Sequence, residues 1–69
     1  MKILFIVSSN IPEVIWNAFR LANIMLEDMA EVTIFLNGPS VQYEGLDSTQ
    51  FPLKTLAKTF TLSEGQLLA

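Results

Sequence analysis

The first hydrophobic segment of the chain, residues 2–8, is apolar almost without interruption. Its letters, KILFIVS, are rich in β-branched and aromatic residues, and polar residues do not alternate with the apolar ones. This pattern is typical of a strand that is buried on both faces of a parallel sheet. The sequence therefore predicts a strand here that needs cover above and below.

A helical period follows, from residue 12 to about residue 30. Asn10 and Glu13 have the spacing of a capping box, and Pro12 suits the first helical turn. The apolar positions fall on one broad face: Val14, Ile15, Ala18, Phe19, Leu21, Ala22, Met25, Leu26, Met29 and Ala30. The polar positions fall opposite: Asn17, Arg20, Asn23, Glu27 and Asp28. Trp16 and Ile24 project from the polar side, near Arg20 and Asn23, where a lone monomer gains little from a Trp.

A second strand is predicted at Glu31–Leu36, ended by the breakers Asn37, Gly38 and Pro39. A strand, a helix and a strand this short join as a parallel pair, with a right-handed crossover in about 98% of cases. Residues 40–50 show no period, so we expect a loop.

The C-terminal third of the chain predicts a second helix and the start of a third strand. Residues 51–60 place apolar side chains at helical spacing, with Pro52 in the first turn and Thr49 or Gln50 as the cap. Residues 63–65 form a turn, and residues 66–69 resemble the opening of a strand. The predicted fold class is α/β: a three-layer, doubly wound (Rossmann-like) parallel sheet, incomplete in this chain, in the order β-α-β-α-start of β. Further residues or partner subunits would complete it.

Composition makes association the expected route to stability. A chain of 69 residues forms at most one domain, and its single core gives only a few kcal/mol of net stability. It has no Cys for a disulfide and, lacking His as well, offers only carboxylates and amides to a metal. We expect no metal and no cofactor. Charged residues are 16% of the chain, against about 25% in ordinary soluble domains, so we expect a homo-oligomer.

Charge and hydropathy exclude two classes of partner. The net charge is −3, and the four basic residues are scattered at Lys2, Arg20, Lys54 and Lys58. Nucleic-acid binding needs a basic stripe, so it is not expected. The apolar run at residues 3–7 is too short for a membrane span or a secretory signal, so we expect a cytoplasmic protein.

Five segments in this order and spacing resemble small DsrE/DsrF-like proteins of the sulfur-relay family. The segments are MKILFIVSSN, PEVIWNAFRLAN, EVTIFLNG, FPLKTLAKTF and SEGQLLA. The resemblance implies that residues 1–69 are one DsrE-like domain, truncated at the C-terminal side. It also implies a doubly wound subunit in trimers or hexamers, sulfur-relay proteins as partners, and persulfide transfer by a cysteine directly after Ala69.

No residue within the 69 is expected to be catalytic. Persulfide transfer needs a thiolate, and Ser and Thr hydroxyls neither hold a labile sulfur nor ionise near neutral pH. The carboxylates show no spacing that pairs two of them for acid–base chemistry. The expected function is therefore a non-catalytic binding component, or a fragment, of a sulfur-relay type protein. The alternative is a homo-oligomeric interaction module without sulfur chemistry.

Two groups of residues are candidate sites. Ser8, Ser9 and Asn10 follow the first strand, and Asn37 and Gly38 follow the second, where helix N–H groups and the helix dipole can hold an anion such as a sulfur oxyanion or a partner's thiolate. The alternative reading is a helix cap, a strand end and a simple turn. The turn SSNIPE has no glycine, which disfavours a nucleotide site.

Trp16, Arg20 and Ile24 are the candidate interface, because aromatic and Arg residues are enriched in interface cores. A ligand site formed by Trp16, Arg20 and Asn23 is the alternative.

Overall fold

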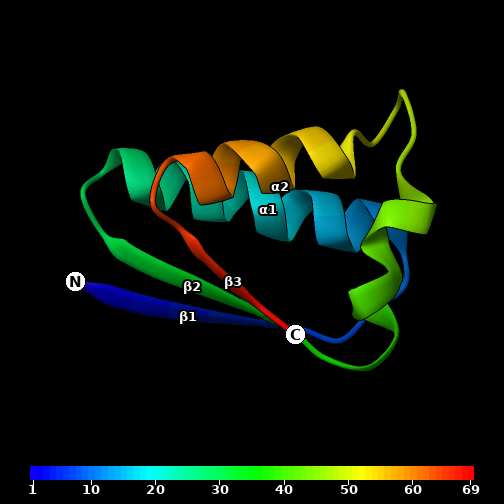
Figure 1. Ribbon diagram of the computed structural model, residues 1–69, viewed down its shortest axis with the longest axis horizontal. Helices are drawn as coiled ribbons and strands as arrows, with labels where there is room; N and C mark the ends of the chain where they lie inside the picture. The colour runs from blue at the N-terminus through cyan, green and yellow to red at the C-terminus, as the bar shows by residue number, and fades with distance from the viewer.

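Three parallel strands and two α-helices alternate along the chain, and the computed structural model describes all of residues 1–69 (Figure 1). The elements are β1 (Lys2–Val7), α1 (Pro12–Glu27), β2 (Glu31–Leu36), the 3-10 helix η1 (Gly38–Leu46), α2 (Leu53–Leu62) and β3 (Gln66–Leu68). The predicted α/β class and the order of its elements are confirmed. Neither α-helix has the length and apolar character that crossing a membrane requires.

The sheet has the strand order β1-β2-β3, and both pairs are parallel. Lys2 is level with Glu31 and Val7 with Leu36, while Phe35 is level with Leu68. The parallel pairing predicted for the first two strands is confirmed, and the expected start of a third strand pairs with β2.

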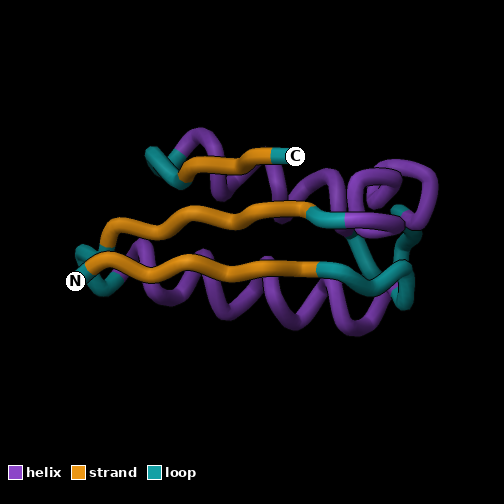
Figure 2. The backbone as a smooth tube through the Cα atoms, turned by 90° about the horizontal axis from the view of Figure 1, so that it is seen from below, coloured by secondary structure: helices purple, strands orange, loops and turns teal.

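Both helices lie on the same face of the sheet, and no element covers the other face (Figures 1 and 2). Within these 69 residues β1 therefore has cover on one face only, and Leu4 and Ile6 on the other face are 61% and 62% exposed. The physical reason lies in the strand order. Two successive crossovers of one hand, each moving the chain to the next strand in the same direction, place both helices on one face.

The core fills the space between the helices and the sheet. Side chains alternate along each strand, so one set points to the helices and the next points away. Ten apolar residues are buried: Val7, Ile15, Phe19, Ala22, Val32, Ile34, Leu36, Leu53, Ala57 and Phe60. The helix members recur three or four positions apart, as one stripe on each helix requires.

The helix starts differ from the predicted caps. Asn10 does not cap α1: the N-cap is Ile11, whose φ of −83° and ψ of 117° are extended, as expected for a residue before proline. Neither Thr49 nor Gln50 caps α2, since Asp47 Oδ1 accepts the Lys54 N–H at 2.8 Å instead.

Two expected boundaries are also corrected. The first helix ends at Glu27 rather than near residue 30, and Met29 turns the chain with a φ of 68°. The expected loop contains η1, two short helical turns joined across Gln42. Tyr43 of η1 meets Phe19 edge to face at 5.5 Å, so η1 packs on the core.

Candidate functional site

Ser8 and Asn37 come together at the carboxyl edge of the sheet. Because Val7 and Leu36 are level, the residues that follow them are neighbours. The Asn37 Nδ2 group donates a hydrogen bond to Ser8 Oγ at 3.3 Å, and both residues are exposed. Gly38 follows with a φ of 59°, a left-handed conformation that glycine adopts without strain. This edge is where open α/β sheets hold their ligands.

Ser40 connects η1 to this edge of the sheet through hydrogen bonds, and this role was not predicted from the sequence. It is fully buried, and its Oγ lies 2.5 Å from the Val7 carbonyl oxygen and 2.9 Å from the Asn37 carbonyl oxygen. The single hydroxyl hydrogen is shared between these two acceptors. Ser40 therefore fixes the start of η1 against the ends of β1 and β2, and the aperiodic segment around it carries no pattern that predicts this.

The start of α1 offers little to an anion. The Ile11 N–H donates to Ser9 Oγ at 3.0 Å, and Pro12 has no N–H, so two of the first donors are not free. The Glu13 carboxylate lies in the same turn. Free N–H groups are what attract an anion to a helix start, and here they are few.

Asn10 lines a different hollow, an open depression of about 320 Å³. Its other lining residues are Pro39, Val41, Gln42, Glu44, Gly45 and Leu46. The Glu44 carboxylate in this lining opposes a bound anion. The structure thus joins Ser8 with Asn37 but directs Ser9 to the backbone of the α1 start.

Trp16 has a partner within the chain. Its ring meets Phe51 edge to face with centroids 5.3 Å apart, and the Arg20 guanidinium carbon lies 4.3 Å from its centroid. The idea that a lone monomer gains little from Trp16 is therefore corrected, because the ring bridges α1 to the segment before α2. Asn23 is also engaged, since its Nδ2 donates to the Leu56 carbonyl oxygen at 3.3 Å. Of the candidate interface, Ile24 remains exposed without such a partner.

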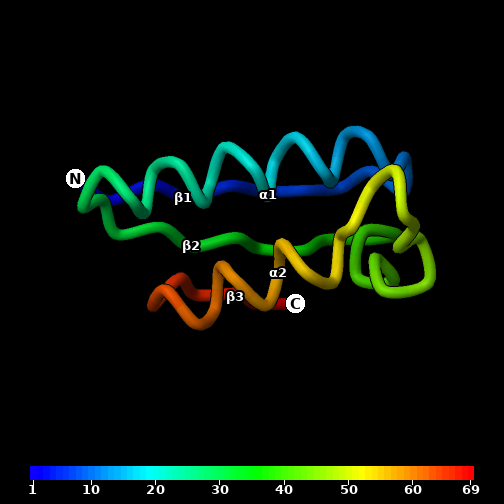
Figure 3. Tube along the Cα trace, turned by 90° about the horizontal axis from the view of Figure 1, so that it is seen from above, coloured from blue at the N-terminus to red at the C-terminus, as the bar shows by residue number.

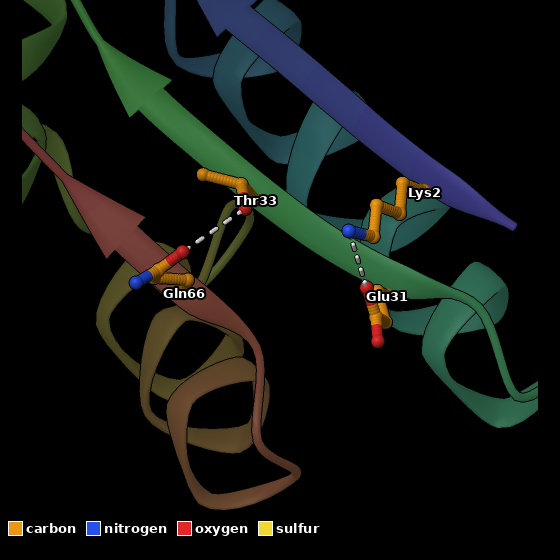
Figure 4. Close-up of polar contacts among 4 residues, drawn as sticks. All are labelled: Lys2, Glu31, Thr33 and Gln66. Atoms are coloured by element: carbon orange, nitrogen blue, oxygen red, sulfur yellow. Dashed lines mark hydrogen bonds and ion pairs between the residues drawn. The ribbon is translucent and has the colours of Figure 1, made fainter.

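The uncovered face of the sheet is the largest unexplained feature, and we call it the bare face. Its carboxyl part carries four exposed apolar side chains: Leu4, Ile6, Phe35 and Leu68. Its amino part is polar (Figure 4). There Lys2 Nζ lies 3.9 Å from Glu31 Oε2, and Thr33 Oγ1 donates to Gln66 Oε1 at 3.3 Å. The signal was present in the sequence at alternate positions of each strand, because Lys2, Glu31, Thr33 and Gln66 all belong to the set that stays uncovered.

The remaining chemistry of the chain is sparse. Burial, with a smaller contribution from the Glu44 charge, raises the pKa of Tyr43 above its ordinary value. No three acidic side chains are grouped as metal ligands would be. The largest hollow, about 690 Å³, opens at the opposite, amino edge of the sheet, between the ends of both helices and β2.

No family model, curated protein or solved structure matches this chain.

Proposed function

We propose that this chain is a non-catalytic binding module that works inside a larger protein assembly and docks through the bare face. One observation carries the proposal: a parallel sheet leaves large apolar side chains in water. Parallel sheets occur almost only with both faces covered, because the crossover helices between their strands pack on the two faces. Here Leu4, Ile6, Phe35 and Leu68 have no cover.

The free energy at stake is comparable to the stability of the fold. Full burial of one large apolar side chain gives about 1.5–3 kcal/mol, and these four are roughly half exposed, so covering each gains about 1 kcal/mol. A core of this size supplies only a few kcal/mol of net stability. The free energy gained by covering the bare face is therefore of the same size as the net stability of the folded chain.

The partner we favour for this face is another copy of the chain, which makes the protein a homo-oligomeric module. Two sheets pack face to face about 10 Å apart when their apolar side chains interdigitate. The bare face holds one lysine and one glutamate, already paired as Lys2 and Glu31. It therefore adds no net charge to the contact, although each copy carries −3 overall.

Sedimentation velocity of the wild-type chain and of Phe35→Lys tests this role. Phe35 lies mid-face on the central strand, so a lysine there should weaken association at least tenfold. Leu62→Lys is the matched control, since Leu62 is exposed at the end of α2, away from the sheet. A wild-type chain that stays a monomer at micromolar concentration contradicts the proposal.

A second candidate function is binding within a DsrE-like sulfur-relay assembly, with a doubly wound sheet completed beyond this chain. Two observations favour it. Ser8 and Asn37 meet at the carboxyl edge of the sheet, and continuing the β2–β3 register brings the position after Ala69 level with Asn37. A cysteine there would stand beside two hydrogen-bonding side chains.

The reading frame beyond Ala69 decides between the two functions. A cysteine codon directly after Ala69 supports the sulfur-relay role, and an in-frame stop removes it. For the 69-residue chain itself, thiosulfate should raise the melting temperature if the carboxyl edge binds sulfur anions. A flat titration, identical to that of Asn37→Asp, counts against anion binding there.

A further inference from the structure

We propose that Asn37 is a site of spontaneous deamidation, and that Ser40 and Ser8 slow this reaction in the folded chain. Deamidation needs no enzyme, because the backbone nitrogen of the next residue attacks the asparagine side chain. The inference goes beyond both functions proposed above and depends on neither of them. The site lies where β2 leads into η1, at one end of the molecule (Figure 3).

The reaction exchanges the Asn37 side-chain amide for a carboxylate. A base in solution removes the Gly38 amide proton, and the Gly38 nitrogen forms a bond with Asn37 Cγ. The Cγ–Nδ2 bond breaks, Nδ2 leaves as ammonia, and a cyclic succinimide remains. Water then opens the ring at either of its carbonyl groups and gives aspartate or isoaspartate. No oxidant or reductant takes part.

Asn37 is the one asparagine of this chain that precedes a glycine. Glycine has no Cβ, so its backbone nitrogen approaches the neighbouring side chain with the least steric hindrance. Each of the other three asparagines precedes a residue with a side chain: Asn10 before Ile11, Asn17 before Ala18 and Asn23 before Ile24. The chain therefore contains its own controls, two of which lie within the hydrogen-bonded backbone of α1.

The attacking nitrogen and the amide that it attacks are both accessible to solvent. Asn37 and Gly38 are exposed. Gly38 is the first residue of η1, so its N–H has no partner within that helix, and no other backbone hydrogen bond of the chain engages it. A Cβ built on Gly38 would meet no atom within 4 Å. Base and water can therefore reach this peptide group.

The folded backbone holds Asn37 in a conformation that does not react. Its φ of −121° and ψ of 142° are extended, and the five-membered ring cannot close in this conformation. Closure requires a rotation about the Asn37 Cα–C bond, which also moves the Asn37 carbonyl oxygen. That oxygen accepts hydrogen bonds from Ser40 Oγ at 2.9 Å and from the Ser40 N–H at 3.4 Å. Ser40 therefore opposes the rotation.

Ser8 restrains the other reacting group. The Asn37 Nδ2 group, which must leave, donates to Ser8 Oγ at 3.3 Å, and this bond fixes the direction of the side chain. Ser40 is fully buried and Ser8 is exposed, so the first restraint is the stronger one. The rate at Asn37 should therefore depend on how firmly η1 is held against the sheet.

Deamidation changes the carboxyl edge of the sheet in two ways. The new carboxylate removes the Nδ2 donor from Ser8 and takes the net charge from −3 to −4, which opposes a bound anion. Isoaspartate also adds a methylene to the main chain between the Asn37 N–H, which binds the Val7 carbonyl oxygen, and the carbonyl oxygen that binds Ser40. The join between β2 and η1 is then distorted.

Peptide mass spectrometry of the wild-type chain, aged in neutral buffer with and without urea, tests the site. Asn37 should convert to aspartate and isoaspartate, several-fold faster in urea than in the folded chain, while the other three asparagines stay amides. Gly38→Ala should slow the conversion at least about tenfold in urea, where the left-handed φ of Gly38 no longer matters. Conversion at all four asparagines alike, or none at Asn37 in urea, would overturn the proposal.

Ser40→Ala tests the restraint separately from the site. It should speed the conversion of Asn37 several-fold in the folded chain and leave the rate in urea unchanged. Gly65→Ala is the control for general instability, because it crowds Phe60 in the core. Equal acceleration by Ser40→Ala and Gly65→Ala would mean that unfolding, and not Ser40, sets the rate. If Ser40→Ala does not fold, Ser8→Ala decides: it should also speed the conversion, and an unchanged rate contradicts the restraint.

Discussion

The two faces of the three-stranded sheet differ in how far their side chains are buried. On the helix side, Val32, Ile34 and Leu36 are almost fully buried, because α1 and α2 close over them. On the bare face, the neighbouring Phe35 is 37% exposed. The helix side is apolar throughout, whereas the bare face is apolar at its carboxyl part and polar at its amino part. The direction in which the chain crosses from strand to strand decides which face of the sheet it covers and which face it leaves bare.

The strongest test of this difference between the two faces is to replace two adjacent residues of β2 by alanine, one at a time. Ile34→Ala opens a cavity at a fully buried position and should cost about 2–5 kcal/mol, enough to unfold much of a domain this small. Phe35→Ala should cost the monomer no more than about 1 kcal/mol, because Phe35 is 37% exposed and is flanked only by its cross-strand neighbours Ile6 and Leu68. Urea unfolding followed by circular dichroism, at concentrations below association, measures both. Equal losses would mean that both faces are covered in the monomer.

Local sequence patterns predicted the helices and strands well, but they did not predict what covers each face of the sheet. The unbroken apolar run of β1 and the helical period of α1 are local properties, so they could be read directly. The same run cannot tell whether Leu4 and Ile6 are covered by this chain or by another, since hydrophobicity records burial and not the identity of the cover. The packing of Trp16 within the monomer was not predicted for a related reason: its partner Phe51 lies 35 positions later in the chain.

At the candidate site, strand ends were predictable and hydrogen-bond partners were not. Ser8 and Asn37 follow strands that pair in parallel, so their proximity follows from the fold. Ser40 acts through two hydrogen bonds and Asp47 through one, and both residues are placed by the path of η1, which no periodic pattern encodes. The proline at position 12 favoured Ile11 over Asn10 as the cap, a competition between two local rules that only the backbone resolves.

Alanine substitution at two glycines should have a smaller effect on stability. Gly65 lies against the core and Gly45 faces open space, so the second variant is the control for the first. A Cβ on Gly65 would stand 2.5 Å from the Phe60 ring, the aromatic side chain that fills the core beneath β3. Gly65→Ala should therefore cost about 1–3 kcal/mol through overpacking. A Cβ on Gly45 would meet nothing within 4 Å, so Gly45→Ala should stabilise by about 0.4–1 kcal/mol through the unfolded chain. Thermal unfolding of both variants checks the opposite signs, and a shared sign would place Phe60 away from Gly65.

The smallest expected effect on stability concerns Tyr43, a polar residue of η1 that packs on the covered side of the molecule. Its ring packs on Phe19, and burial followed by the Glu44 charge raises its pKa above the ordinary 10.0. The neutral phenol is favoured in the folded state, so this contribution is fully present below pH 10. It is lost as pH rises from that value through the raised pKa. The measurement is the difference between wild type and Tyr43→Phe in unfolding free energy from pH 8 to 11, in which the contributions of all other groups cancel. The Phe variant keeps the aromatic contact and should lose stability less steeply with pH. Parallel curves would show that the Tyr43 hydroxyl faces water, and that the covered side ends before η1.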